Sequence, residues 1–368
     1  VEHVIQKATQ VKKRRNTEGH FVDAYRKGPG IGPVYALLQT GKTLIAGQGG
    51  KLVCYEADTR EKIWEYTTNG DVRHVAFGVN ALIASTSTGH IYCFRKDAEK
   101  LITIQPSTEV FTIDDSVRLL SDQILGLAGI DSGFALVPGE INMELLAAIA
   151  EKSNLNIYQA ADTGPLGEIR RRLDDAGLYG RRITIHRVSL NPLPYIDYFA
   201  DLIVAEESIC RKMKADELYR VLRPCGGVAI ICCSKKDHPS VIAWLKKNEL
   251  ENAEITTVDI GVRLVRGQLP GAGSWTHPYA DTGRYCASED QLARLPFKVQ
   301  WFGGPGPGHM VNRHYRPPVS VAVNGRLFIP GSHSVIALNA YNGRELWRKK
   351  VPDVGRWPAA YRGGAVAA

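Results

Sequence analysis

Histidine and carboxylate side chains that can bind a metal ion or an anion gather in one glycine- and proline-rich stretch. They are His277, Asp281, His309 and His314. Their spacings match no standard zinc motif. Gly303–Gly308 predicts a tightly turned, exposed loop, and Arg313 beside it can bind an acidic group. The stretch predicts either a metal or anion site or, if His277 and Asp281 make structural hydrogen bonds, a brace between two domains.

A repeat of short strands flanks the middle of the sequence. Residues 41–64 (GKTLIAGQGGKLVCYEADTREKIW) align without a gap with residues 324–347 (NGRLFIPGSHSVIALNAYNGRELW). A third copy begins at Asn80, and its Leu82 follows Leu44 by 38 residues, close to the roughly 40-residue period of a propeller blade. Each copy has two apolar strands joined by a Gly/Ser turn, then a hairpin tip. The pattern predicts four-stranded blades of a β-propeller.

The end of the repeat gives it a family resemblance. Residues 340–347, AYNGRELW, resemble the closing phrase of the PQQ-like propeller repeat, in which Trp64 and Trp347 are expected to fill the wedge between adjacent blades. Some quinoprotein dehydrogenases of this kind close a vicinal disulfide over the quinone, and this chain has Cys232-Cys233. That pair ends an apolar run, which predicts a buried strand instead. Calcium-binding acids and a stacking tryptophan are not recognisable, so PQQ is not expected, and a quinoprotein-type oxidoreductase is only a secondary alternative.

The region from 115 to 268 alternates strands with helices. Strands are predicted at 133–137, 155–160, 182–186, 200–205, 227–232, 254–259 and 261–266, and helices at 143–152, 166–176, 212–222 and 239–247. Alternation of this kind predicts a doubly wound parallel sheet, and ligands of such sheets bind at the carboxyl ends of the strands.

Four phrases in this region resemble the later motifs of class I S-adenosylmethionine-dependent methyltransferases. They are DDAGLYG at 174–180, LPY at 193–195, ADLIVAE at 200–206 and ELYRVLRPCGG at 217–227. With LPGAGSWTH at 269–277 and GPGHMVNRH at 306–314, the chain resembles a group of large bacterial proteins, known mainly from planctomycetes, in which a methyltransferase-like domain is inserted into a PQQ-like propeller.

The resemblance implies a Rossmann-like methyltransferase fold between blades of an incomplete propeller. The implied domains are an N-terminal segment (1–33), propeller blades (34–114), the methyltransferase-like insert (115–268), a His/Gly/Pro-rich connector (269–318) and a truncated blade (319–368). The rest of the propeller is expected from sequence beyond this chain, and a protein or small-molecule ligand is expected at the propeller face.

The implied cofactor positions depart from the family pattern. The family carries an acidic-x-G-x-G-x-G turn after the first strand, because glycine lets the backbone approach the cofactor closely. In this chain Ala135 stands in place of the acidic residue, and Gly139 is the one glycine of the turn that remains. The resemblance also implies an acidic residue that binds the ribose of the cofactor, and Ala160 stands at its position.

The residues left to hold S-adenosylmethionine are Gly139, Glu140, Asp162 and Ser189, where Asp162 requires a shifted loop and Ser189 replaces the acid near the adenine. Glu206, followed by Glu207, stands where the family often places catalytic residues, or the two form an ordinary surface pair. The pattern favours a degenerate, non-catalytic methyltransferase-like domain, and an active enzyme with an altered cofactor pocket is the alternative.

Composition places further bounds on the function. The 368 residues are 44% hydrophobic and 23% charged, as in ordinary globular proteins, and carry a formal charge of +8. The densest basic runs, Lys12–Arg15 and Arg170–Arg172, lack interleaved aromatic residues, so nucleic-acid binding is not expected. No apolar run is long enough to span a membrane. Seven cysteines at irregular spacing predict neither a zinc site nor a disulfide framework, and the compartment stays open.

Overall fold

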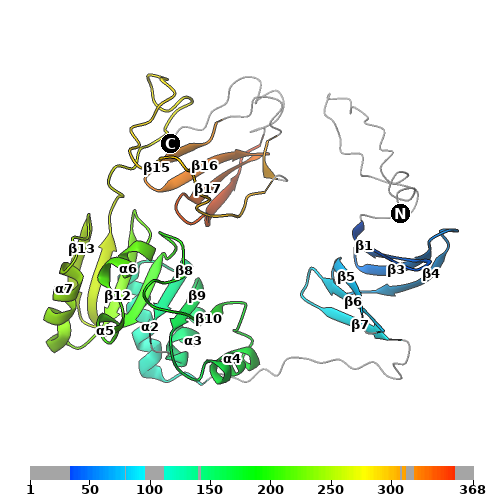
Figure 1. The fold of residues 1–368 in the computed structure, drawn as a ribbon, viewed down its shortest axis with the longest axis horizontal. Coiled ribbons are helices and arrows are strands. Elements are labelled where there is room, and N and C mark those ends of the chain that lie inside the picture. Colours follow the sequence, from blue (N-terminus) through cyan, green and yellow to red (C-terminus); the bar gives the residue numbers. More distant parts are fainter. Residues whose placement is uncertain are drawn as a thin grey trace. The chain divides into compact units, whose positions relative to one another are not determined.

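The computed structural model describes residues 34–78, 80–95, 112–139, 142–306, 309–311 and 319–352 (Figure 1). The chain forms two compact units, Val1–Ile104 and Gln105–Ala368, and each is described here by itself. The predicted segment 1–33 lies outside the described residues, and so do Glu140, Arg313 and His314.

The first unit contains two antiparallel sheets. In the first sheet each strand pairs with the next along the chain; its strands are β1 (Val34–Thr40), β2 (Thr43–Gln48), β3 (Lys51–Glu56) and β4 (Lys62–Thr67). The second has β5 (Val72–Gly78), β6 (Ala81–Thr86) and β7 (Ile91–Arg95). Buried side chains such as Leu52 and Leu82 join the two sheets in one apolar core. The Trp64 ring lies 5.1 Å from that of Phe94, edge to face, so it contacts the second sheet, although Trp64 and Trp347 are both exposed in the structure and do not fill a closed wedge there.

The second unit is built on a seven-stranded sheet. Its strands are β8 (Ser132–Pro138), β9 (Asn154–Ala161), β10 (Ile183–Arg187), β11 (Leu202–Glu206), β12 (Gly227–Cys232), β13 (Ala253–Val258) and β14 (Gly261–Arg266). Their order is β10-β9-β8-β11-β12-β14-β13, and β14 is antiparallel to both of its neighbours. The predicted doubly wound sheet is therefore parallel over five strands and closes with an antiparallel hairpin.

Helices cover both faces of this sheet. They are α2 (Asp115–Ala128), α3 (Met143–Lys152), α4 (Leu166–Asp175), α5 (Ile209–Lys212), α6 (Ala215–Val221) and α7 (His238–Lys246), with a 3-10 turn η1 (Lys235–Asp237). One apolar core joins α2, α3 and α4 to the first face, and a second joins α5, α6 and α7 to the other. Burial on both faces explains why the strands read as continuous apolar runs.

One predicted helix needs correction, and one helix of the structure was not predicted. The helix predicted over 212–222 is shorter, because Met213 and Lys214 are extended and separate α5 from α6. Helix α2 was not predicted, although its start has a recognisable cap: the Asp114 carboxylate accepts a hydrogen bond from the Ser116 amide. Its end at Gly129, with φ of 63°, is also an ordinary helix stop.

The last sheet is a second four-stranded antiparallel meander. Its strands are β15 (Val321–Val323), β16 (Arg326–Gly331), β17 (Ser334–Asn339) and β18 (Glu345–Lys350), paired in chain order. Trp301 of the connector packs on it, and its indole N–H donates to the Ala340 carbonyl at 2.9 Å. Gly343 has φ of 73°, and a Cβ there would come within 2.3 Å of the Trp301 ring. This copy of the repeat therefore favours glycine at the turn for two reasons, whereas the aligned residue of the first copy, Arg60, adopts φ of 65° without being glycine.

In the part of the chain that the structure describes, no helix combines the length and the apolar character needed to cross a membrane.

Candidate functional site

The carboxyl edge of the seven-stranded sheet holds the residues that the sequence predicts for a cofactor. Gly139 follows β8, Asp162 follows β9, Ser189 lies two residues beyond β10, and Glu206 is the last residue of β11. The chain order reverses between β8 and β11, and ligands of open α/β sheets bind at such a reversal. The fold thus brings these four positions to one edge.

Gly139 is held tightly against the neighbouring strand. Its amide donates to the Ala160 carbonyl at 2.9 Å, and its carbonyl accepts from Nε2 of Gln159 at 3.0 Å. Gln159 is fully buried, and its Oε1 has no hydrogen-bond partner within the described residues. With φ of 100°, Gly139 adopts a conformation that other residues rarely adopt. The amide of Gly139 is therefore used by β9, and one of the two acceptor positions of its carbonyl is filled by Gln159.

The three polar candidates at this edge are exposed and weakly held. The Asp162 carboxylate accepts one hydrogen bond, at 3.3 Å, from the Thr163 hydroxyl. The Ser189 hydroxyl bonds only to backbone groups of Asn191. Glu206 is also exposed, and its negative charge contributes to the raised pKa of the nearby Cys232 thiol. These side chains are available to a ligand because the protein uses little of their bonding capacity.

The cysteine pair beside Glu206 is not poised for redox chemistry. Cys232 ends β12, as predicted, and both it and Cys233 are free thiols. Burial, with a smaller effect of the Glu206 charge, raises the pKa of Cys232 to about 12. A thiol with such a pKa stays protonated at neutral pH and is a poor nucleophile.

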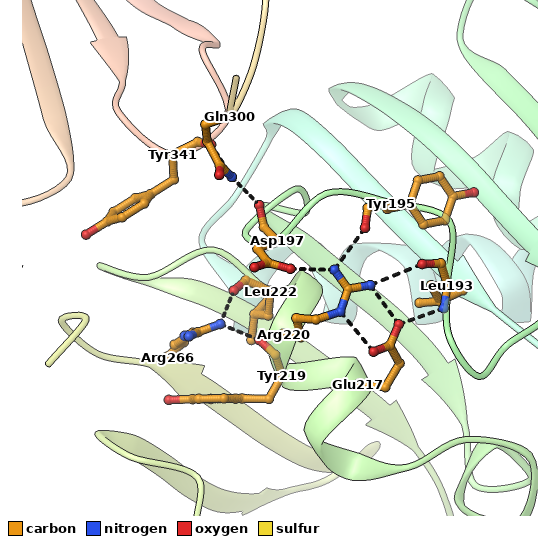
Figure 2. A network of polar contacts seen from close by, with 10 residues as sticks. All are labelled: Leu193, Tyr195, Asp197, Glu217, Tyr219, Arg220, Leu222, Arg266, Gln300 and Tyr341. Atoms are coloured by element: carbon orange, nitrogen blue, oxygen red, sulfur yellow. Dashed lines mark hydrogen bonds and ion pairs between the residues drawn. The ribbon is translucent and has the colours of Figure 1, made fainter. Parts of the chain in front are cut away.

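A long segment without a helix connects β10 to β11 across the face of the sheet. The side chain of Arg220, on α6, holds it with three hydrogen bonds, and the other two N–H groups of its guanidinium bind Glu217 on the same helix (Figure 2). These groups donate to the carbonyls of Leu193 (3.1 Å) and Tyr195 (2.9 Å), to Asp197 (2.6 Å) and to both carboxylate oxygens of Glu217 (2.7 and 2.9 Å). Arg220 therefore fixes the segment that leads from Ser189 to the start of β11.

Sequence reasoning missed one pair of polar side chains, of which one lies in β10 and the other in this segment. The Nδ1 atom of His186, in β10, lies 2.8 Å from the hydroxyl of Tyr195. Both residues are half-buried, and their rings belong to an aromatic cluster with Tyr158 and Phe199. The two residues stand nine positions apart in no familiar motif, so no pattern of residue types could have revealed the pair.

The opposite, amino edge of the sheet holds a buried charge. Asp201, fully buried before β11, accepts from the Phe134 amide (2.9 Å), from Nε of Arg223 (2.6 Å) and from the side-chain amide of Asn342 (3.2 Å). Arg344 forms a further ion pair with it at 3.7 Å. Asn342 and Arg344 lie in the hairpin between β17 and β18, so this cluster joins the last sheet to the α/β part.

The residues predicted for a metal site do not gather in the described residues. Nδ1 of His277 pairs with the hydroxyl of the adjacent Thr276, and the Asp281 carboxylate accepts from the Arg284 amide. His314 lies outside the described residues. Within those ranges, no three His, Cys, Asp or Glu side chains are placed to hold a metal ion.

The stretch around His277 is attached to the last sheet by backbone hydrogen bonds. Trp275 forms an antiparallel bridge with Ala322 of β15. A second bridge, between His277 and Ala280, closes a turn within the connector itself. The carbonyl of His309 accepts from the Ser332 amide at 2.9 Å. Contacts of this kind are those that a brace between the connector and the sheet requires.

Comparison with known proteins gives likenesses at the level of structure alone. No protein-family model and no curated protein sequence matches the chain. A protein of Methanococcus maripaludis described as an S-adenosylmethionine-dependent methyltransferase is 21% identical, with a TM-score of 0.34, over 42% of this chain and 86% of its own. A methyltransferase of Aquifex aeolicus is 14% identical, with a TM-score of 0.33, over 42% of this chain and 97% of its own.

A third similar structure was solved with its cofactor. The magnesium protoporphyrin IX methyltransferase of Synechocystis, with bound S-adenosylmethionine, is 12% identical, with a TM-score of 0.29, over 41% of this chain and 78% of its own. At these identities and scores the likenesses assign neither a family nor an activity. The strand order, parallel over five strands with helices on both faces, makes the α/β part of this chain a Rossmann-like fold.

Proposed function

We propose that this chain is a binding or scaffold protein in which PQQ-like propeller blades carry a methyltransferase-like module that does not transfer methyl groups. The observation that carries the proposal is the turn after β8. Methyl transfer in this fold needs that turn to present free backbone groups to the methionine part of the cofactor. Here the amide of Gly139, the only backbone donor of that glycine, is bonded to Ala160 of β9, and its carbonyl already accepts a hydrogen bond from Gln159.

The acids that would bind the cofactor are missing from the same region. Ala135 and Ala160 stand in β8 and β9 at the positions where the resemblance implies carboxylates, and both are fully buried. A charge-assisted hydrogen bond contributes roughly 1.5–3 kcal/mol, so losing two or more of them weakens binding by orders of magnitude. The module therefore keeps the fold and lacks the binding energy for tight use of S-adenosylmethionine.

The two complete antiparallel meanders support the blade assignment. The sheet β1–β4 and the sheet β15–β18 have the same strand order, and each copy of the repeat supplies the second, third and fourth strands. We propose that a protein or small-molecule partner binds at the face of the propeller to which these blades belong.

Isothermal titration of S-adenosylmethionine and S-adenosylhomocysteine into the full chain tests the proposal. The expected result is no binding at micromolar concentrations and no transfer of a labelled methyl group. Micromolar binding that an Asp162→Ala variant abolishes would overturn it. Asp175→Ala, which removes an exposed carboxylate from the end of helix α4, is the matched control.

An active methyltransferase is the second candidate, and one observation favours it. Asp162 and Glu206 both present exposed carboxylates at the carboxyl edge, with few protein partners. In that case Asp162 would bind the ribose hydroxyls and Glu206 would accept a proton from the methyl acceptor. Methyl transfer by the wild type, lost in Glu206→Gln with cofactor affinity unchanged, would establish this candidate.

A further inference from the structure

The last strand of the last sheet leaves one side of its backbone unpaired. Strand β18 stands at the end of the order β15-β16-β17-β18, and within the described residues it pairs with β17 alone. The Val351 amide donates to the His333 carbonyl at 2.9 Å. Hydrogen-bonded pairs alternate along an antiparallel ladder, so the backbone groups of Arg348 and Lys350 point away from β17. Such an edge can pair with a further extended chain.

Strand β18 carries two lysines that no carboxylate of the described residues neutralises. Its charged side chains are Glu345, Arg348, Lys349 and Lys350. Glu345 forms an ion pair with Arg348 at 2.7 Å, which uses the one carboxylate of the strand. Lys349 and Lys350 are exposed, and β17 beside them has no charged residue. With three cations and one carboxylate, the edge has a net charge of +2.

The corresponding edge strand of the first sheet, β4, lacks this charge. The gapless alignment of the repeat continues through β4 and β18. Lys62 and Glu65 form an ion pair at 2.9 Å, at the places that the ion pair of β18 occupies but with the signs exchanged. Tyr66 and Thr67 stand where β18 has its two lysines. The fourth strand of this sheet thus forms without the lysines, so pairing within the sheet does not explain their presence on β18.

An exposed aromatic ring lies beside the lysines. Trp347 is 45% exposed, and the centre of its ring lies 5.9 Å from that of Phe328 on β16. Trp347 pairs with Ala337, and Ala337 pairs with Phe328, so the two rings share one face of the sheet. Side chains alternate between the faces of a strand, so Lys349 projects to this face and Lys350 to the other. A chain paired with β18 would meet a cation on each face and an aromatic ring beside one of them.

The charge of this edge selects its occupant. A second copy of β18 would bring the same net positive charge against it, and like charges on paired strands destabilise a sheet, so pairing between copies is disfavoured. An acidic segment meets no such repulsion, because its carboxylates can pair with both lysines while its backbone bonds to Arg348 and Lys350. An apolar side chain opposite Trp347 would cover the exposed ring.

We propose that β18 is a docking edge for an extended acidic segment of a partner protein, which adds to the sheet β15–β18 as a further strand. Two adjacent carboxylates of the segment lie opposite Lys349 and Lys350, and an apolar residue lies opposite Trp347. The inference goes beyond the proposed scaffold function, because it concerns the edge of one sheet and requires neither the propeller face nor the carboxyl edge of the α/β part.

Fluorescence anisotropy of a labelled short peptide, titrated with the full chain, tests this inference. The probe contains two adjacent aspartates, one neutral residue and a phenylalanine, in the order that antiparallel pairing with β18 requires. We expect saturable binding that weakens as salt is added, because salt screens exposed charges. A peptide with asparagines in place of the aspartates should bind roughly tenfold more weakly. A peptide methylated on alternate backbone nitrogens should also bind more weakly, because it lacks donors for the ladder.

Replacing the lysines by the residues of β4 gives the matched variant. Lys349→Tyr with Lys350→Thr should weaken binding of the acidic peptide roughly tenfold, through the loss of two exposed ion pairs. Lys246→Thr with Lys247→Thr, which removes an exposed lysine pair at the end of α7, is the control and should bind like the wild type. Circular dichroism checks that both variants fold, and the asparagine peptide tests the same contacts on the unaltered protein.

Three results would overturn the proposal. The first is no binding of the acidic peptide to the wild type, and the second is equal binding to the two lysine variants. The third is a single-stranded oligonucleotide that binds more tightly than the peptide and depends on the same lysines. These outcomes do not involve S-adenosylmethionine, so they leave the test of the proposed function independent.

Discussion

The two edges of the seven-stranded sheet use polar residues in opposite ways. At the amino edge a fully buried carboxylate, Asp201, is surrounded by Arg223, Asn342 and Arg344, and the last two belong to another sheet. At the carboxyl edge Asp162 and Glu206 are exposed and have few partners. At the amino edge the charged residues pair with one another and join two sheets, whereas at the carboxyl edge they face solvent.

This difference indicates which edge of the sheet holds the parts of the second unit together. A buried ion pair gives little net stability compared with apolar packing, but breaking one is costly, so such clusters enforce one arrangement of the parts they join. The amino edge therefore fixes the sheet β15–β18 to the α/β part, while the carboxyl edge stays open to ligands.

Replacing Asp201 should have the largest effect. Asp201→Asn keeps the shape of the side chain and leaves the partly buried Arg223 and Arg344 without a counter-charge, so we expect a loss of about 3 kcal/mol in the free energy of unfolding. Urea unfolding of the second unit measures the loss. Asp162→Asn, the control at the carboxyl edge, should change stability by less than about 0.5 kcal/mol. Equal effects at the two positions would remove the contrast between the edges.

Two glycines with positive φ, one at each edge of the sheet, allow a second test of the difference between the edges. Gly133 has φ of 121°, and a Cβ there would come within 2.3 Å of the Asp201 carboxylate. Gly139 has φ of 100°, and its nearest contact would be Cδ1 of Ile209 at 3.4 Å. We expect Gly133→Ala to cost about 3 kcal/mol, from strain plus overpacking, and Gly139→Ala about 1 kcal/mol, from strain. Thermal unfolding of both variants should show this order, and the reverse order would contradict the crowded amino edge.

Acid should weaken the segment that Arg220 holds. Burial alone raises the pKa of Glu217, but hydrogen bonds from Arg220 and from the Leu193 amide, with the Arg220 charge, outweigh it and leave the pKa below the ordinary 4.5. A lowered folded-state pKa gives stability that is fully present above the ordinary value and is lost as the pH falls below it.

The measurement is the free energy of unfolding at pH 7 and near pH 3. The wild type should lose more stability than Glu217→Gln over this range, by about 1 kcal/mol, the size of one net hydrogen bond. Glu254→Gln is the control, because its carboxylate is exposed and lies 4.0 Å from Arg263. Identical pH profiles of the wild type and Glu217→Gln would show that Arg220 does not depend on this carboxylate.

Replacing Glu206 should have the smallest effect on stability. Glu206 is exposed at the end of β11, so Glu206→Gln should shift the free energy of unfolding by less than about 0.5 kcal/mol. The same variant slightly lowers the pKa of Cys232, because the nearby negative charge is removed. Thermal unfolding and the rate of thiol alkylation check the two expectations, and a large loss of stability would make Glu206 a structural residue.

Much of the fold could be predicted because its signals are local. The apolar runs and hairpin turns of the repeat predict the strands β2–β4 and β16–β18, which pair with their neighbours along the chain. Helix α3 and strand β12 have the bounds that the sequence predicts. The segment from β10 to β11 is different, because Arg220 on a later helix, and no pattern of its own, holds it in place.

The candidate site could be predicted in part. The ends of β8, β9, β10 and β11 follow from the strand assignments, so the sequence alone puts Gly139, Asp162, Ser189 and Glu206 at one edge. The engagement of Gly139 by Gln159 and the contact of His186 with Tyr195 depend on side-chain directions across strands. Such directions are set by register and packing, and spacing along the chain does not reveal them.

The sequence by itself determined the strands of the repeat, the alternating α/β order and the alanines at positions 135 and 160, because periodicity, turn chemistry and residue identity are properties of short stretches. Only the tertiary structure decided that Asp201 meets Asn342 and Arg344, more than a hundred residues later, and that His186 stands beside Ala160. A buried charge or an imidazole finds its partners by position in space, and long-range packing fixes that position only once the sheets have formed.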